Sequence, residues 1–375
     1  MRLADLGARV IKVESSSGDT TRRFGPPFID GESPYFMSFN RGKESIVLDL
    51  KSKAGKEFVE RVLPQADVLV ENFRPGVMDR LGFADDVLSS QHPKLIRVGI
   101  TGFGPQSRRH GEAAFDLAIQ AESGLMSMNG EEGGESCRVP ISIADLAAGS
   151  AAAEATLAAL FQRERQGIGC RVDIALLDSL VALFGYQAQG SLMTGVNPTK
   201  MGHRHPNLAP YQGFATADGM IVLAVAMEAQ WQRLQNVEDM PQSLSRPEWH
   251  ENCGRVELQL ELESCLKSVF SEQTTATWMK RLKDADVPIG PVRTVGEMIS
   301  ELESQQSDFL KSYQHQTLGA VRMTTSPITW EGKERDATSI APPTLGQHSL
   351  ALIHEFSGNN EQEAEWQNAL KGVHN

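Results

Sequence analysis

Short apolar runs alternate with amphipathic stretches along the first half of the chain. The runs at 10–13, 45–50, 67–71 and 95–100 have the length and the Val, Ile and Leu content of buried strands, and a helical pattern at 54–63 separates two of them. Strands that alternate with helices predict parallel β-α-β units with right-handed crossovers. We therefore expect an α/β domain with a parallel sheet, whose ligands bind at the carboxyl ends of the strands.

The chain opens in the middle of such a unit. Residues 1–6 have the pattern of a last helical turn, Gly7 has the position of a C-cap, and the strand at 10–13 follows directly. A buried strand needs neighbours to pair with. We therefore expect a further strand and helix upstream of Met1.

A carboxylate precedes the most alanine-dense part of the chain. Alanine is the strongest helix former, so residues 146–163 predict a long helix that starts just after Asp145. In one interpretation Asp145 is the N-cap of this helix, a role that stabilises by about 1 kcal/mol. In the other, a carboxylate at the positive end of a helix faces a cleft and is an anionic nucleophile held in a fixed direction.

The second half of the chain has a different character. A turn and a strand near 167–174 lead into an apolar stretch that predicts one helix from Ala175 to about Met193. The Gly- and Pro-rich segment 195–212 is typical of a linker. Beyond it, Asp218-Gly219 between two apolar runs predicts a hairpin, and helical patterns start at Ala229, Val256 and Thr275.

These patterns predict two domains and a C-terminal segment that rejoins the first of them. The large parallel-sheet domain covers 1–194, the linker 195–212 and a small α+β domain 213–295. We expect the last segment, 296–375, to return to the large domain.

Composition narrows the classes of function. The chain has 375 residues and a formal net charge of −12, which argues against nucleic-acid binding, since phosphate contacts need clustered Lys and Arg. Four widely spaced cysteines suggest neither a disulfide framework nor a zinc site, and His203 with His205 is more typical of a loop than of a metal centre. No apolar run suggests a membrane span or signal peptide, so we expect a cytoplasmic protein that binds no membrane.

Cationic and aromatic residues follow the predicted strands. Lys51 and Arg80 are suited to phosphate groups, and Phe73 is suited to a flat ring or an extended apolar chain. Each could equally be a solvated charge or a core aromatic. The run Gly99-x-x-Gly102-x-Gly104 does not match the dinucleotide-binding pattern, and no Walker-type loop occurs.

Taken together, motifs spread from residue 4 to about 350 give the chain a family resemblance. They are Asp5-Leu-Gly-Ala, Val10-Ile-Lys-Val-Glu14, Gly18-Asp19-x-Thr-Arg22, Asn40-Arg-Gly-Lys43-x-Ser45, Val70-Glu-Asn-Phe73-x-Pro-Gly76, Thr101-Gly-Phe-Gly-Pro105, Gln120-Ala-x-Ser-Gly124, Asp145, Gly202-x-x-His205-Pro206 and Pro342-x-x-Leu-Gly346. The set resembles the class III CoA-transferases, such as the formyl-CoA, carnitine and succinyl-CoA:glutarate enzymes. This resemblance implies an interlocked homodimer in which each chain has a large Rossmann-like domain and a small domain.

The resemblance also implies the site. The family's nucleophilic aspartate falls on Asp145, and contacts with coenzyme A fall on Leu48, Lys51, Asn72, Phe73, Arg74 and Arg80, to which we add Phe115 and Asp116. Two departures are the absence of the family's first strand and helix, with its Ala-Gly-Pro motif, and Ser15 after Glu14, where some members have a phosphate-binding arginine.

The implied reaction moves CoA from an acyl-CoA donor to a carboxylic acid acceptor through an aspartyl anhydride and an aspartyl-CoA thioester on Asp145, with no metal. An acceptor dicarboxylate would need a local cation, for which Arg22, Arg41, Arg204 and His205 are candidates. One alternative is an acyl-CoA racemase, disfavoured because the related racemase has His where this chain has Phe115. The other is a non-catalytic, truncated CoA-binding homologue.

Overall fold

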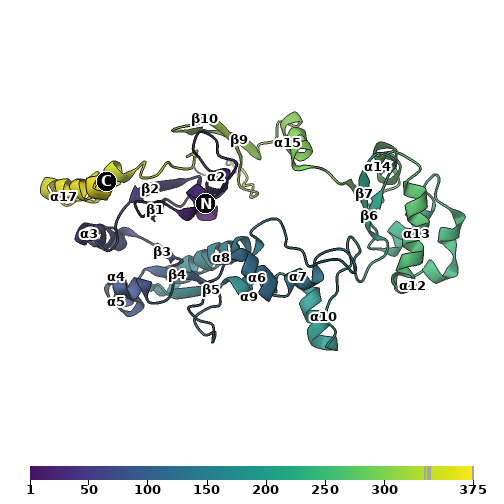
Figure 1. Ribbon diagram of the computed structural model, residues 1–375, viewed down its shortest axis with the longest axis horizontal. Helices are drawn as coiled ribbons and strands as arrows, with labels where there is room; N and C mark the ends of the chain where they lie inside the picture. The colour runs from purple at the N-terminus through teal and green to yellow at the C-terminus, as the bar shows by residue number, and fades with distance from the viewer. Residues whose placement is uncertain (333–334, 336–338, 374–375) are drawn as a thin grey trace. The chain divides into compact units, whose positions relative to one another are not determined.

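The computed structural model describes residues 1–332, 335 and 339–373, and the chain divides into two compact units (Figure 1). The first unit contains residues 1–119, 141–185 and 302–375, and the second contains 120–140 and 186–301. These boundaries differ from the expected ones because 120–140 and 186–194, expected in the large domain, belong to the second unit. The last segment joins the first unit, although from residue 302 rather than 296.

Parallel strands form the centre of the first unit, in two sheets. Strand β1 (Val10–Glu14) pairs with β2 (Lys43–Val47), and β4 (Ile96–Thr101) lies between β3 (Val68–Glu71) and β5 (Arg171–Ala175). All five strands fall within one to four residues of the apolar runs that predicted them. The predicted α/β class with parallel strands is confirmed.

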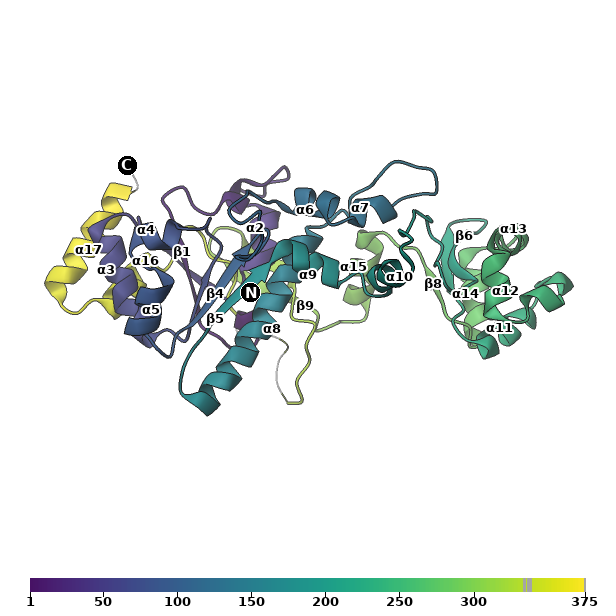
Figure 2. The ribbon, with the colours of Figure 1, turned by 90° about the horizontal axis from the view of Figure 1, so that it is seen from below.

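Helices surround these strands. The helices of the first unit are α1 (Arg2–Asp5), α2 (Pro34–Asn40), α3 (Lys53–Val62), α4 (Val77–Leu81), α5 (Asp85–Gln91), α8 (Ile143–Gln166), α9 (Leu176–Ala182), α16 (Ser349–Phe356) and α17 (Asn360–Val373). Helix α6 (Asp116–Glu122) crosses the boundary between the units. In Figure 2, α8 lies along β4 and β5, and its Ala152 and Ala159 pack on Ile96 and Val98 of β4.

The end of the described chain completes the core near β2. Helices α16 and α17 lie beside α3 in both views (Figures 1 and 2). Phe58 of α3 makes edge-on ring contacts with Phe356 and Trp366 at centroid distances of 5.8 and 5.4 Å. Before these helices, β9 (Leu310–His315) and β10 (Gly319–Thr324) form an antiparallel hairpin.

The second unit is a three-stranded antiparallel sheet with helices. Strand β7 (Met220–Ala224) lies between β6 (Tyr211–Ala215) and β8 (Ile289–Pro291), and the predicted hairpin turn at Asp218-Gly219 is present. Its helices are α7 (Leu125–Met128), α10 (Tyr186–Thr194), α11 (Glu228–Gln235), α12 (Asn252–Glu257), α13 (Gln259–Phe270) and α14 (Thr275–Asp284). Helix α15 (Val295–Ser304) leads back to the first unit.

The helix predicted from Ala175 to Met193 is two helices. Helix α9 ends at Ala182 and α10 begins at Tyr186, with Gly185 between them at a φ of 50°. A positive φ is a left-handed conformation that ends a right-handed helix and that glycine adopts without strain. Apolar periodicity continues across the break, which is why the pattern predicted one helix.

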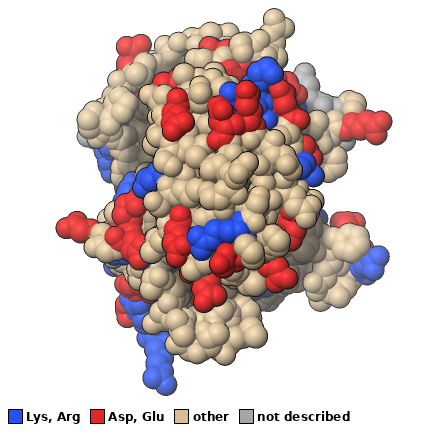
Figure 3. Space-filling model, turned by 90° about the vertical axis from the view of Figure 1, so that its right-hand side faces the viewer, with Lys and Arg blue, Asp and Glu red and all other residues tan. Residues whose placement is uncertain are grey.

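Helix α8 also departs from expectation, because its length and composition alone would allow it to cross a membrane. Its apolar character comes largely from alanines, and part of its surface packs on β4 and β5. A core helix of a water-soluble protein has the same properties. On the face of the molecule in Figure 3, acidic and basic side chains are interspersed among uncharged ones.

Candidate active site

The carboxyl ends of β3 and β4 and the N-terminus of α8 define one edge of the first unit. The strands are parallel, so their loops leave at the same edge, and α8, which leads back toward the start of β5, begins at that edge. Ligands in parallel α/β sheets bind at this edge. It carries Asn72, Phe73, Arg74 and Asp145.

The loop after β3 is fixed by its own hydrogen bonds. The Asn72 amide donates to the carbonyl of Ile100 on β4, and the Phe73 N–H donates to Oε2 of Glu71 at 2.9 Å. Gly76, at a φ of 75°, then turns the chain into α4. These contacts fix the backbone of Phe73 at the strand end, and its side chain is 43% exposed.

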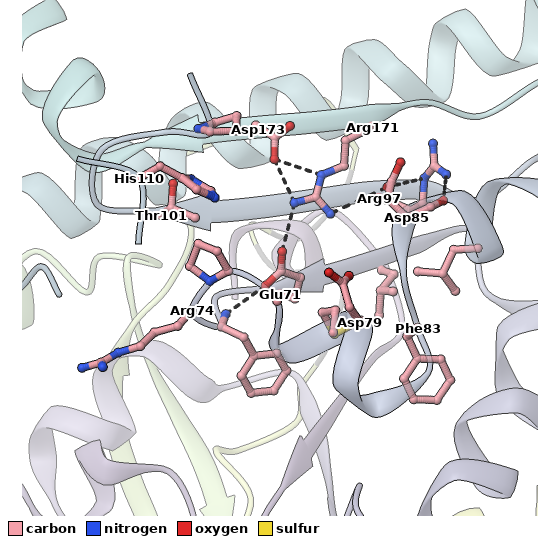
Figure 4. A pocket seen from close by; sticks show the side chains of 17 residues that line it. Glu71, Arg74, Asp79, Phe83, Asp85, Arg97, Thr101, His110, Arg171 and Asp173 are labelled. Atoms are coloured by element: carbon pink, nitrogen blue, oxygen red, sulfur yellow. Dashed lines mark hydrogen bonds and ion pairs between the residues drawn. The ribbon is translucent and has the colours of Figure 1, made fainter. Parts of the chain in front are cut away.

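A cavity of about 330 Å³ adjoins this loop (Figure 4). Its lining includes Glu71, Phe73, Arg74, Gly76, Asp79, Asp85, Arg97, Thr101, His110, Arg171 and Asp173. Most of the charged side chains there form a network, whereas Arg74 extends away from that network in Figure 4. Phe73 and Arg74 thus line the cavity, whereas Asn72 and Arg80 do not. Arg80 of α4 lies close to the lining residue Gly76, since a Cβ built there would lie 3.3 Å from its guanidinium.

Asp145 is not the N-cap of α8, which corrects one of the two interpretations. The helix begins at Ile143 after Ser142, so Asp145 lies in its first turn. The carboxylate that accepts a first-turn N–H belongs to Asp116, whose Oδ1 lies 2.8 Å from the Ala144 nitrogen. Tyr35 of α2 steadies the same end, since its hydroxyl lies 2.9 Å from the Ser142 hydroxyl.

The ionisation of Asp145 is perturbed. Solvent reaches this side chain, but surrounding protein atoms remove part of its hydration, and the negative charge of Asp116 lies near. Desolvation first, and then Asp116, raise the pKa of Asp145 to about 6. No hydrogen bond to the Asp145 carboxylate is recorded within the described residues, so its oxygens are open to a ligand.

The remaining residues that were predicted to contact CoA differ in how exposed they are. Leu48 has only 7% of its surface exposed and its side chain lies in the core beside Phe58, so only its backbone can face a ligand. Lys51 is exposed in the turn before α3, and its backbone N–H donates to the Asp49 carboxylate at 2.9 Å. Phe115 is 77% exposed directly before α6.

Two residues that sequence reasoning missed support the loop after β3. Glu71 and Arg171 form an ion pair at 3.0 Å within the charged network of the cavity. Glu71 stands inside a quoted motif, yet its partner lies 100 residues away. This contact could have been predicted only from the register in which β3, β4 and β5 pair.

His203 and His205 lie in the loop that leads into β6. Within the part of the chain that the structure describes, no three His, Cys, Asp or Glu side chains are grouped as a metal site requires. His205 lies between the rings of Tyr186 and Tyr211, and His203 lies 3.7 Å from Glu131. That the reaction needs no metal stays a prediction.

Comparisons with known proteins agree with one another on the family that this chain resembles. Residues 1–349 match the family described as CoA-transferase family III. Succinyl-CoA:glutarate CoA-transferase of Mus musculus is 33% identical over 95% of this chain and 81% of its own length. Acetyl-CoA:oxalate CoA-transferase of Acetobacter aceti is 35% identical over 95% of this chain and 90% of its length. The crystal structure of a CAIB/BAIF family protein from Brucella suis superimposes with a TM-score of 0.82 at 32% identity, covering 95% of this chain and 93% of the other.

Proposed function

The chain belongs to CoA-transferase family III and is a CoA-transferase, and we propose that it moves CoA from an acyl-CoA to a carboxylic acid through covalent intermediates on Asp145. The observation that carries this proposal is the Asp145 carboxylate. It lies in the first turn of α8 at the ligand-binding edge of the sheet, it accepts no recorded hydrogen bond from the described residues, and its pKa of about 6 leaves it mostly ionised at neutral pH.

The proposed reaction begins with attack of an Asp145 oxygen on the thioester carbonyl. The C–S bond breaks, leaving an acyl-aspartyl anhydride and free CoA thiolate. The thiolate attacks the aspartyl carbonyl, which releases the donor acid and forms an aspartyl-CoA thioester. The acceptor carboxylate attacks that thioester, giving a second anhydride and the thiolate. Attack of the thiolate on the acceptor's acyl carbonyl then forms the new acyl-CoA and frees Asp145.

Several groups favour these steps. The N-terminal end of the α8 dipole favours negative charge near Asp145, while the first-turn N–H groups of Ile143 and Ala144 already donate to Ile141 and Asp116. We assign CoA binding to the exposed Lys51, Arg74 and Arg80, with Asn72 and Phe73 beside the pantetheine chain. Leu48 contributes only its backbone, because its side chain is in the core.

The acceptor is proposed to be a small dicarboxylic acid. The names of relatives pair CoA transfer with glutarate, in the mouse enzyme, and with oxalate, in the Acetobacter enzyme. In this chain, the candidate partners of the second carboxylate are Arg22, Arg41, Arg204 and His205. Arg41 is the weakest of them, since it is 2% exposed and paired with Asp5 at 2.7 Å.

Racemisation is disfavoured by the side chain before Asp116. Phe115 is exposed but cannot take a proton, and a racemase needs a base with a pKa near working pH. A non-catalytic CoA-binding homologue would bind CoA without exchanging it.

A single experiment separates these functions. Purified protein is incubated with succinyl-CoA and a panel of mono- and dicarboxylic acids, and products are identified by mass spectrometry. New acyl-CoA species in the wild type, and none with Asp145→Asn, are expected. Exchange of the α-proton without new acyl-CoA would establish the racemase instead. The absence of both reactions, with CoA bound, would establish the non-catalytic homologue.

We also propose that the protein is an interlocked homodimer in the cytoplasm. Large apolar side chains project from several helices: Leu157 and Phe161 of α8 are 45% and 62% exposed, and Leu192 and Met193 of α10 are 81% and 77% exposed. Burial of such side chains is worth about 25 cal/mol per Å². A second copy of the chain would remove them from water.

A further inference from the structure

A group of charged side chains on the three-stranded sheet lies next to the loop after β3. Glu71 of β3, Gly99 of β4 and Asp173 of β5 are register partners, so they form one row across the sheet. Arg171 lies two residues before Asp173 and therefore points to the same face. Its guanidinium contacts Asp173 at 2.8 Å and crosses β4 to reach Glu71 at 3.0 Å (Figure 4).

Gly99 is what allows this crossing. A Cβ at residue 99 would lie 2.0 Å from an Nη atom of Arg171 and 2.9 Å from Oε1 of Glu71. Every other residue type would occupy the space that the guanidinium now fills. The glycine thus has a packing reason, without any demand on its backbone conformation.

Glu71 links Arg171 to the loop after β3 through hydrogen bonds. One oxygen of its carboxylate pairs with Arg171, and the other accepts the Phe73 N–H at 2.9 Å. The Glu71 side chain is only 10% exposed, so its charge depends on these partners. Without Arg171 the carboxylate gains hydration by turning toward water, and the Phe73 N–H then loses its acceptor.

From this geometry we infer that Arg171 is a positioning residue for CoA binding, acting over Gly99 and through Glu71 to hold the Phe73–Arg74 loop in its binding conformation. The inference rests on the proposed function, in which that loop contacts CoA. Neither Arg171 nor Gly99 is itself a catalytic residue. Their loss should therefore weaken CoA binding and leave the chemistry on bound substrate intact.

The test uses the full-length protein and free CoA. Gly99→Ala displaces the flexible end of Arg171 and crowds Oε1 of Glu71, whereas Arg171→Met removes the guanidinium charge. Isothermal titration of each variant with CoA is expected to give a Kd about tenfold higher than the wild type, equivalent to ~1.4 kcal/mol. The KM for succinyl-CoA should rise by a similar factor, with kcat changed less than about twofold. Gly290→Ala is the matched control, since a Cβ there meets nothing within 4 Å, and its Kd should stay at the wild-type value.

Rescue distinguishes positioning from general damage. In the Arg171→Met background, Glu71→Gln removes the charge that has lost its partner, while the amide oxygen can still accept the Phe73 N–H. The double variant should bind CoA more tightly than Arg171→Met alone. If Glu71 and Arg171 acted on CoA binding independently of each other, their losses would multiply in the double variant.

The outcomes separate the two levels of inference. If the wild type binds no CoA, the proposed function fails. If the wild type binds CoA and both Gly99→Ala and Arg171→Met bind it equally well, the positioning role fails alone. An equal loss in Gly290→Ala, a fall in kcat at unchanged KM, or multiplying losses in the double variant would also overturn it. Should Gly99→Ala not fold, Arg171→Met and the double variant decide.

Discussion

At the scale of single residues, substitution of Asp145 tests whether this carboxylate stabilises α8 or takes part in the reaction. Asp116 caps the first turn of α8, so Asp145→Asn should leave the melting temperature nearly unchanged. Because an amide is no nucleophile, CoA transfer should fall about a thousandfold or more, equivalent to ~4 kcal/mol of barrier. Hydroxylamine trapping after acyl-CoA addition should modify residue 145 in the wild type only. An active Asn variant without a trapped adduct would remove the proposed mechanism.

The pair of carboxylates at this helix end also predicts a pH dependence. Desolvation and the charge of Asp116 raise the pKa of Asp145 to about 6, and only the ionised form attacks. The value of kcat/KM should therefore fall about tenfold per pH unit below pH 6. Asp116→Asn keeps an acceptor for the Ala144 N–H but removes the negative charge, so the acid limb should move to lower pH. A limb at the same pH in both proteins would mean that Asp145 does not govern it.

At the scale of elements, Arg255 of α12 joins four parts of the second unit. It is 1% exposed, and it donates to the carbonyls of Ala209, Trp249 and His250 and to the Glu228 carboxylate. Arg255→Met should leave these acceptors unsatisfied and cost about 3–5 kcal/mol of unfolding free energy, as measured by urea denaturation. Arg246→Met in the same unit should cost less than about 1 kcal/mol, because its ion pairs are exposed. Similar losses for both would contradict this reading.

Elements whose signals are local were the ones that could be predicted. The apolar runs gave the strands to within four residues, and Asp218-Gly219 gave the turn between β6 and β7. The break at Gly185 was missed because α9 and α10 continue one apolar pattern across it. The contact between Arg171 and Glu71 could not be predicted, since it depends on which strands pair and in what register. The assignment of Leu48 to the ligand came from the family resemblance and stays a prediction, now restricted to its backbone because its side chain lies in the core.

At the scale of the whole molecule, the exposed apolar side chains predict the oligomeric state. Sedimentation at micromolar concentration should give a dimer, because Phe161, Leu192 and Met193 would otherwise stay in water. Phe161→Glu should shift the balance toward monomer, while Lys280→Glu, at a charged exposed position, should not. A wild-type monomer would mean that these side chains have another role.

The packing of α16 and α17 on α3 has a consequence for synthesis on the ribosome. Phe58 is covered by side chains from residues 352–366, roughly 300 residues later in the chain. At about 5–20 residues per second, translation of that interval takes roughly 15–60 s. During this time the nascent chain exposes the apolar surface of β2 and α3. The first unit can thus complete its fold only after α16 and α17 have left the exit tunnel, and until then this apolar surface is open to aggregation or to chaperones.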